Sequence, residues 1–171
     1  EVCLVGSEMC IRDSNNSSVQ SELARVYEDS GEDPLEIFKA RFEDNQDNAS
    51  YAVEYADKLM SNGDTEEAID VLENTLSYNR ENSMVYMSLG KAYNDNSDFE
   101  DAVDILEDLF ELDRNNFRVA MLISVNSIEI DDFDSAFEWG NKSMKISKNN
   151  AESLAHMGNL YYKAMQSCRG D

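Results

Sequence analysis

Three features of this 171-residue sequence could support chemistry: a single histidine and two clusters of acidic and amide side chains. His156 stands alone, and a lone histidine is far more often a helix-surface residue than a ligand. The segment Asn94-Asp95-Asn96-Ser97-Asp98 offers oxygen ligands of the kind that Ca²⁺ binds. It lacks the turn glycine of a calcium loop, however, and Ile105 stands where such a loop places its bidentate glutamate. We interpret this segment as a turn between helices, and Asp131-Asp132-Phe133-Asp134 as a helix start.

No arrangement of catalytic residues is present elsewhere in the sequence. It contains no His-Glu-x-x-His pair, no phosphate-binding glycine loop and no nucleophile elbow. Its three cysteines do not form a metal-binding motif, and two of them, Cys3 and Cys10, fall in a segment that is excluded below. The sequence therefore predicts a protein that is not an enzyme and that has no cofactor and no metal site.

The charge balance narrows the class of partner. The formal net charge is −22, from 36 acidic and 14 basic residues. Phosphate contacts require a basic face, so we expect no nucleic-acid binding and no attraction to anionic membranes. No apolar run approaches the roughly 20 residues of a membrane-spanning helix. A neutral or basic partner fits this chain best.

The strongest structural signal is a repeat of 34 residues. Ala68, Ala102 and Ala136 are spaced by this period, and each follows an aspartate by four residues. Pairs of polar residues recur downstream with the same spacing, at Glu81-Asn82, Asn115-Asn116 and Asn149-Asn150. A fixed period of this size indicates stacked repeats that each contribute one supersecondary unit.

The residues within each period resemble the tetratricopeptide repeat, which is a pair of antiparallel helices. The clearest copy carries the pattern at Tyr86, Leu89, Gly90, Tyr93, Ala102 and Leu106. The other copies keep it at Ala52, Tyr55, Ala56, Leu59, Ala68 and Leu72, at Ala120, Ile123, Ser124, Ser127 and Ala136, and at Leu154, Met157, Gly158 and Tyr161. The resemblance implies an all-α fold, a right-handed α-solenoid of antiparallel helix pairs.

The period also predicts how the chain is divided. We expect repeats over 49–82, 83–116 and 117–150, preceded by a degenerate repeat over 17–48. Residues 151–165 are either a partial repeat or a capping helix. Residues 4–14 resemble one reading frame of a sequencing-library adapter, so we exclude 1–14 as an artefact. On this interpretation the chain is a metagenomic fragment, and its native N-terminus is missing.

Small residues and polar residues predict the joints between helices. Ala56, Gly90, Ser124 and Gly158 recur in phase, which favours positions where two helices pack closely. Asn82, Asn116 and Asn150 are candidate N-caps of the following helices. Asp64-Thr65-Glu66-Glu67 and Ser97-Asp98-Phe99-Glu100 have the spacing of capping boxes, in which two side chains cap the helix reciprocally.

In tetratricopeptide arrays the first helices of successive repeats line a concave groove that holds a partner segment. The resemblance places one stripe of side chains in that groove: Val53, Asp57, Met60, Met84, Met87, Lys91, Arg118, Met121, Val125 and Ile128. Several are methionines, whose flexible side chains suit binding surfaces. The alternative is that these residues belong to the core, particularly in the fourth repeat, where residues 117–130 are apolar nearly all round.

The resemblance implies a non-catalytic scaffold for protein–protein interaction whose partner is a protein or peptide, apolar or amphipathic. A carboxylate clamp of the cochaperone type is not expected, because its positions here hold Val53, Asp57, Ser88, Arg118 and Leu122, with only one basic residue. The alternative is the accessory repeat region of a larger enzyme or of a secretion or assembly protein. The single cysteine outside residues 1–14 favours a reducing, cytoplasmic compartment only weakly, and the sequence does not identify the localisation.

Overall fold

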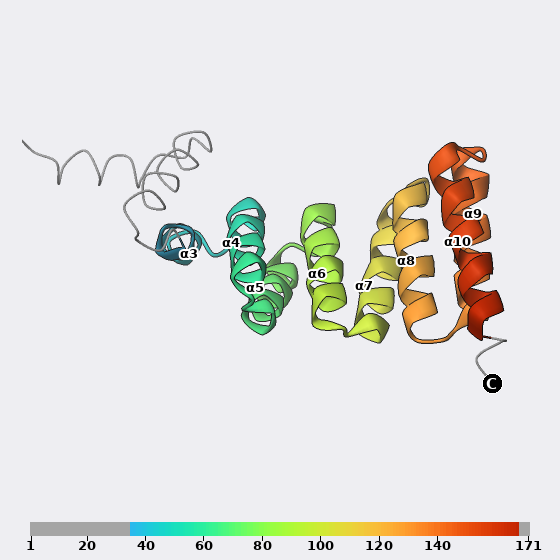
Figure 1. The fold of residues 1–171 in the computed structure, drawn as a ribbon. Coiled ribbons are helices and arrows are strands. Elements are labelled where there is room, and N and C mark those ends of the chain that lie inside the picture. Colours follow the sequence, from blue (N-terminus) through green and yellow to red (C-terminus); the bar gives the residue numbers. More distant parts are fainter. Residues whose placement is uncertain (1–34, 168–171) are drawn as a thin grey trace, which may run out of the picture.

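The structure is a computed structural model that describes residues 35–167 (Figure 1). This part of the chain is helical and contains no strand. Its helices are α3 (Leu35–Glu43), α4 (Ala49–Asn62), α5 (Thr65–Tyr78), α6 (Ser83–Asn96), α7 (Phe99–Leu112), α8 (Phe117–Glu129), α9 (Phe133–Ser147) and α10 (Ala151–Ser167).

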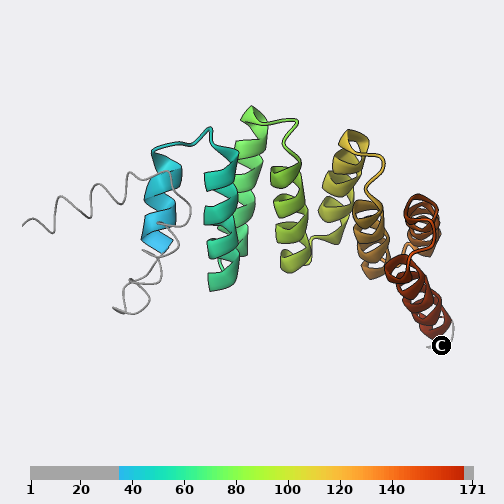
Figure 2. The ribbon, with the colours of Figure 1, turned by 90° about the horizontal axis from the view of Figure 1, so that it is seen from above.

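Successive helices form antiparallel hairpins that follow one another along a single direction (Figures 1 and 2). The pairs are α4 with α5, α6 with α7, and α8 with α9, and each hairpin also packs against the next. α3 packs on α4, and α10 packs on both α8 and α9. The expected all-α solenoid of tetratricopeptide type is thus confirmed.

The core runs through the middle of the stack as three neighbouring clusters. The largest is centred on Leu59, Leu72 and Leu89, the next on Leu106 and Ile123, and the last on Met157 and Leu160. Ala68, Ala102 and Ala136 are completely buried, as the 34-residue period requires. A small side chain lets two helix backbones approach closely, which is consistent with the recurrence of alanine at this position.

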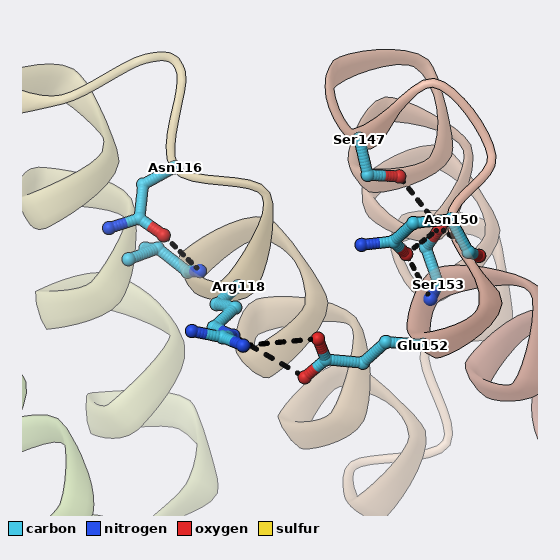
Figure 3. A network of polar contacts seen from close by, with 7 residues as sticks. Asn116, Arg118, Ser147, Asn150, Glu152 and Ser153 are labelled. Atoms are coloured by element: carbon cyan, nitrogen blue, oxygen red, sulfur yellow. Dashed lines mark hydrogen bonds and ion pairs between the residues drawn. The ribbon is translucent and has the colours of Figure 1, made fainter.

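Asparagine side chains begin the first helix of each hairpin. Asn48 and Asn82 have extended backbones and accept hydrogen bonds from the amides of Ser50 and Met84. Asn116 caps α8, and Asn150 accepts from the Ser153 amide at the start of α10 (Figure 3). The predicted caps at Asn82, Asn116 and Asn150 are therefore confirmed. Each satisfies an amide that would otherwise lack a partner in the first turn.

The two predicted capping boxes are wrong. Asp64 and Asp98 precede α5 and α7, but neither side chain caps its helix. The Asp98 carboxylate instead accepts from the Asn96 side chain at 2.7 Å, and Glu67 accepts from the Tyr55 hydroxyl at 2.9 Å. Ser97 has a left-handed backbone and ends α6, so it is not available as the first residue of a box.

The acidic turns behave as interhelical connections. Residues 94–96 end α6, Ser97 and Asp98 form the turn to α7, and Asp132 caps α9 by accepting from the Ser135 amide at 3.0 Å. That hydrogen bond holds the pKa of Asp132 below its ordinary value. The helix start predicted at residues 131–134 is confirmed, and the turn predicted for residues 94–98 is confirmed only at Ser97 and Asp98. Within residues 35–167, no group of three or more His, Cys, Asp or Glu side chains could hold a metal ion.

The small residues of the repeat do not all pack against a helix. A Cβ added at Gly90 would lie 2.9 Å from Leu106 Cδ2, so α6 and α7 are in contact there. Ser124 is buried and donates to the Ala136 carbonyl of α9 at 2.6 Å. A Cβ at Gly158, in contrast, would meet nothing within 4 Å. The predicted packing role of Gly158 is therefore wrong for the part of the chain that is described.

Some expectations fall outside residues 35–167. The adapter-like segment 1–14 lies there, as does the first half of the degenerate repeat 17–48. Of that repeat the structure describes α3, which packs on α4 and buries Phe38 and Phe42 in the same core cluster as Tyr55 and Leu59. The boundaries proposed for the repeats stay predictions.

Candidate partner-binding groove

The first helices of the hairpins present one pocket of about 480 Å³, centred on α6. α4 packs closely against α6, and α8 packs against α10, whereas α6 and α8 do not pack closely. The pocket occupies this wider interval. Its walls come from α4, α6 and α8 and its floor from α7, with the lining residues Asp57, Met87, Ser88, Gly90, Lys91, Asn94, Leu106, Leu122, Val125 and Asn126.

Four of the ten residues predicted for the groove line this pocket: Asp57, Met87, Lys91 and Val125. Lys91 Nζ lies 3.6 Å from Asp57 Oδ1 across the α4–α6 boundary, and both side chains are more than half exposed. An exposed ion pair of this kind contributes at most about 1 kcal/mol. Lys91 and Asp57 can therefore give up this ion pair and contact a partner at a small cost in free energy.

The other six predicted residues are distributed around the pocket. Met84 and Arg118 are exposed in the first turns of α6 and α8. Val53 and Met60 are half-buried and pack against the cluster around Leu59. Met121 is half-buried on α8, and Ile128 is half-buried against the last core cluster.

The floor of the pocket depends on the absence of a side chain at Gly90. Leu106 reaches from α7 to the backbone of α6 at this glycine and is almost completely buried. Its side chain consequently belongs both to the core and to the pocket lining. The sequence pattern contains Leu106 only as a position of the repeat, and the three-dimensional arrangement reveals that it belongs to both the core and the pocket.

A pair of amide side chains spans the interval between α6 and α8. Asn94 Nδ2 donates to Asn126 Oδ1 at 2.6 Å, and Asn126 Nδ2 donates to the Leu122 carbonyl at 2.9 Å. Asn126 is only 1% exposed. The sequence analysis missed it, although a polar residue in the otherwise apolar stretch 117–130 is a usable signal, because a buried amide needs hydrogen-bond partners.

Ion pairs also join successive first helices at one-repeat spacing. Arg118 of α8 points toward Glu152 of α10, with Nη2 and Oε2 3.4 Å apart (Figure 3). Lys163 and Glu129 join the same two helices at 2.5 Å. Together with Lys91 and Asp57, these pairs place charged residues along the edge formed by the first helices. Because each of these cations is already paired with a carboxylate, less positive charge is available to an anionic ligand.

Two tyrosine hydroxyls connect helices next to the pocket. Tyr55 donates to Glu67 and Tyr93 donates to Glu73. Burial, followed by these carboxylates, raises the pKa of both tyrosines well above the ordinary value. The hydroxyls consequently remain protonated donors at any physiological pH.

The histidine is not a surface residue, contrary to the expectation from the sequence. His156 is half-buried between α10 and α8, and its Nε2 lies 2.9 Å from Ser124 Oγ. Ser124 has one proton and gives it to the Ala136 carbonyl, so Nε2 must be the donor to Ser124. Burial lowers the pKa of His156.

This arrangement predicts a destabilisation by acid at the α8–α10 contact. The unfolded chain takes up a proton at His156 near pH 6.5, whereas the folded chain does so at lower pH. The stability contributed by neutral His156 should therefore be complete above that pH and decline as the pH falls below it. Because the chain has one histidine, its single imidazole NMR signal reports this titration directly.

The matched variant is His156→Gln, whose amide can donate to Ser124 without titrating. Its thermal midpoint should fall less than that of the wild type between neutral pH and pH 5. An apparent pKa of His156 at or above the ordinary value, or equal acid sensitivity of the two proteins, would contradict this account.

No helix in the described part of the chain is both long and apolar enough to cross a membrane. This finding concerns residues 35–167 only.

Comparisons with known proteins agree with the helical geometry. Residues 59–125 match a family model described as tetratricopeptide repeat. A search of curated proteins finds no match. A tetratricopeptide repeat protein from Parabacteroides merdae is similar in structure, with a TM-score of 0.71 and 14% identity over 86% of this chain and 59% of that chain.

Two further solved structures are similar. The MamA protein gives a TM-score of 0.68 at 15% identity, over 86% of this chain and 81% of that chain. YrrB, described as a tetratricopeptide repeat protein with an unusual peptide-binding site, gives 0.59 at 17% identity, over 72% of this chain and 63% of that chain. Identities this low show a shared fold.

The matched segment 59–125 runs from the last residues of α4 into α8, and so includes α5 and the whole hairpin α6–α7. It also contains most of the pocket residues. The helix pairs, their buried alanines and their 34-residue period all agree with this match. The segment 59–125 thus matches the tetratricopeptide repeat family, and the described part of the chain has the fold of tetratricopeptide repeat proteins.

Proposed function

We propose that this protein is a non-catalytic scaffold that binds a segment of another protein along the face formed by α4, α6 and α8. The observation that carries the proposal is the pocket of about 480 Å³, which three successive first helices line together. A pocket of this volume accommodates a large side chain of a bound peptide. The described peptide-binding site of YrrB, a protein of the same fold, supports this use of the fold.

The pocket lining indicates the chemistry of the bound segment. Met87, Leu106, Leu122 and Val125 supply apolar walls, and the amide pair Asn94–Asn126 supplies polar groups at one end. Met87 can adapt to the shape of the inserted group because methionine is unbranched and flexible. The best ligand is an amphipathic peptide that inserts one apolar side chain and leaves its polar groups near the amides.

Electrostatics favour a neutral or basic peptide. The whole chain carries a net charge of −22, so an acidic peptide would be repelled as it approached. Within the pocket, Lys91 is already near Asp57, and outside it Arg118 is near Glu152. An acidic C-terminal tail would need to displace these carboxylates in order to gain a cation.

The test begins with a phage-displayed library of dodecapeptides selected on the full chain. We expect the selected peptides to be amphipathic and neutral to basic. Val125→Asp should weaken their binding about tenfold or more, since covering one apolar side chain contributes roughly 1.5–3 kcal/mol. Fluorescence anisotropy with a labelled peptide measures this change. Met121→Asp tests whether the bound segment extends along α8 beyond the pocket.

Leu112→Asp is the matched control, because it adds the same charge at an exposed leucine on α7 outside the pocket. Its affinity should equal that of the wild type, and circular dichroism should show that all variants remain helical. The proposal fails if Val125→Asp binds as tightly as the control, or if selection enriches no peptide. Unfolding of the Val125 variant alone would mean that this residue is core, and Lys91→Glu then tests the pocket at an exposed position.

A further inference from the structure

A chain of hydrogen bonds with a fixed direction ends at the pocket between α6 and α8. The Leu122 carbonyl can only accept, so the group of Asn126 that lies 2.9 Å from it is the NH₂ group. Asn126 Oδ1 consequently accepts from Asn94 Nδ2 at 2.6 Å. Both ends of this almost completely buried amide are thus occupied. The amide that remains for a ligand is that of Asn94.

Asn94 presents mainly a hydrogen-bond acceptor. It lines the pocket and is half-buried. Within residues 35–167 its Oδ1 has no hydrogen-bond partner, whereas one of its two N–H donors is already used by Asn126. A bound segment that covers Asn94 excludes water from this oxygen, and an acceptor buried without a donor costs binding free energy. The group that fills the pocket must therefore bring a donor.

The walls of the pocket favour a large apolar group over a small polar one. They are supplied mainly by the side chains of Met87, Leu106, Leu122 and Val125. The volume of about 480 Å³ is sufficient for an aromatic ring. Such a ring covers much apolar surface with only two side-chain torsions to fix, and the Met87 sulfur is suited to contact its edge. An aromatic residue with a donor at its tip meets both requirements.

A cationic donor fits this pocket less well than a neutral one. Lys91 lines the same pocket and precedes Asn94 by three residues, so the two share one face of α6. The carboxylate in the lining, Asp57, already lies near Lys91. A second cation would lose its hydration in exchange for a neutral amide oxygen. We expect the basic residues of the bound segment outside the pocket, where the net charge of −22 attracts them.

We infer that the pocket takes a tyrosine of the partner segment, whose hydroxyl donates to Asn94 Oδ1. This inference rests on the proposed function and adds the residue type that the site selects. A tyrosine hydroxyl donates once and also accepts, so it can pair with Oδ1 and with the second N–H of Asn94. Tryptophan donates but cannot accept in return. Phenylalanine and leucine contact the same walls but leave Oδ1 without a donor.

A series of peptides that differ at one ring tests the inference on the wild-type protein. In dodecapeptides selected on the full chain, we expect tyrosine to be enriched at one position. Replacing that tyrosine with phenylalanine should weaken binding about tenfold or more, because Asn94 Oδ1 then loses its donor. Replacement with 4-aminophenylalanine, which keeps a donor, should preserve most of the affinity. Fluorescence anisotropy measures all three peptides.

A substitution in the protein identifies the group that recognises the hydroxyl. In Asn94→Ala the tyrosine and phenylalanine peptides should bind with similar affinity. Ser88→Ala is the matched control, because it removes another polar group of the lining, and it should keep the full difference. Thermal unfolding shows whether both variants are folded. The ratio of two affinities on one variant is compared, so a modest loss of stability does not affect the result.

The inference is overturned if the phenylalanine peptide binds the wild type as tightly as the tyrosine peptide. It is also overturned if selection enriches leucine, phenylalanine or a basic residue at the inserted position, or if Ser88→Ala removes the preference and Asn94→Ala does not. In these cases peptides are still bound, and the proposed scaffold function stands. Failure to select any peptide, in contrast, overturns the proposed function and this inference together.

Discussion

Leu106→Ala should lower the free energy of unfolding by about 2–5 kcal/mol, the usual loss for a leucine deleted from a core. Leu106 is 2% exposed and packs with Leu109, Phe110 and Ile123 in the central cluster. It also forms the floor of the pocket, so its removal enlarges the pocket from below. Urea unfolding measures the loss of stability. The affinity for the selected peptides reports the change in the pocket.

The contact with Gly90 provides a sharper test through a double-mutant cycle. Gly90→Ala places a Cβ 2.9 Å from Leu106 Cδ2, so the clash opposes the gain of about 1 kcal/mol in helix propensity. In the Leu106→Ala background the clash disappears and only the gain remains. Gly90→Ala should then stabilise the protein, and the two substitutions should be strongly non-additive.

Leu112→Ala is the control for this series, because it makes the same change at an exposed position of the same helix. Its effect should be within about 0.5 kcal/mol of zero. Additive effects at Gly90 and Leu106, or a loss at Leu112 as large as that at Leu106, would show that α6 and α7 do not meet as described.

Asn126→Asp should cost about 3 kcal/mol at neutral pH, because it buries a carboxylate in place of an amide. The new oxygen would face the Leu122 carbonyl, which now accepts from Asn126 Nδ2 at 2.9 Å. A protonated aspartic acid can still donate there. The loss should consequently diminish as the pH falls and the carboxyl group becomes protonated.

The matched change is Asn74→Asp, which adds the same charge at an exposed position within α5. Denaturation at neutral and acidic pH should separate the two variants, with a large and pH-dependent loss for Asn126 only. Equal losses in both variants would mean that added negative charge, and not the buried amide pair, determines the effect.

The features that repeat could be predicted from the sequence, and those that occur once could not. Alanines 68, 102 and 136 identify the helix crossings because each crossing has the same steric limit. The asparagine caps follow for the same reason. The capping boxes failed because their spacing is also compatible with competing contacts, such as that between Asn96 and Asp98.

The candidate site shows the same division. Asp57, Met87, Lys91 and Val125 were found because they share the register of the first helices. Asn126 and Leu106 were missed because their roles depend on how far α6 and α8 are separated and on the glycine above Leu106. Gly158 matches the pattern in sequence but lacks a neighbour in the described residues, and periodicity alone cannot reveal that difference.

The two sides of this solenoid differ in how strongly successive repeats are joined. The first-helix side carries the exposed ion pairs Lys91–Asp57, Arg118–Glu152 and Lys163–Glu129. On the first-helix side the repeats are tied partly by exposed charges that contribute at most about 1 kcal/mol each and that salt weakens. The rest of each repeat is joined to its neighbours by the apolar core, which is the stronger contact. The curvature of the stacked hairpins should therefore depend on ionic strength. High salt should weaken the contacts between successive first helices and so loosen any hold on a partner bound along them.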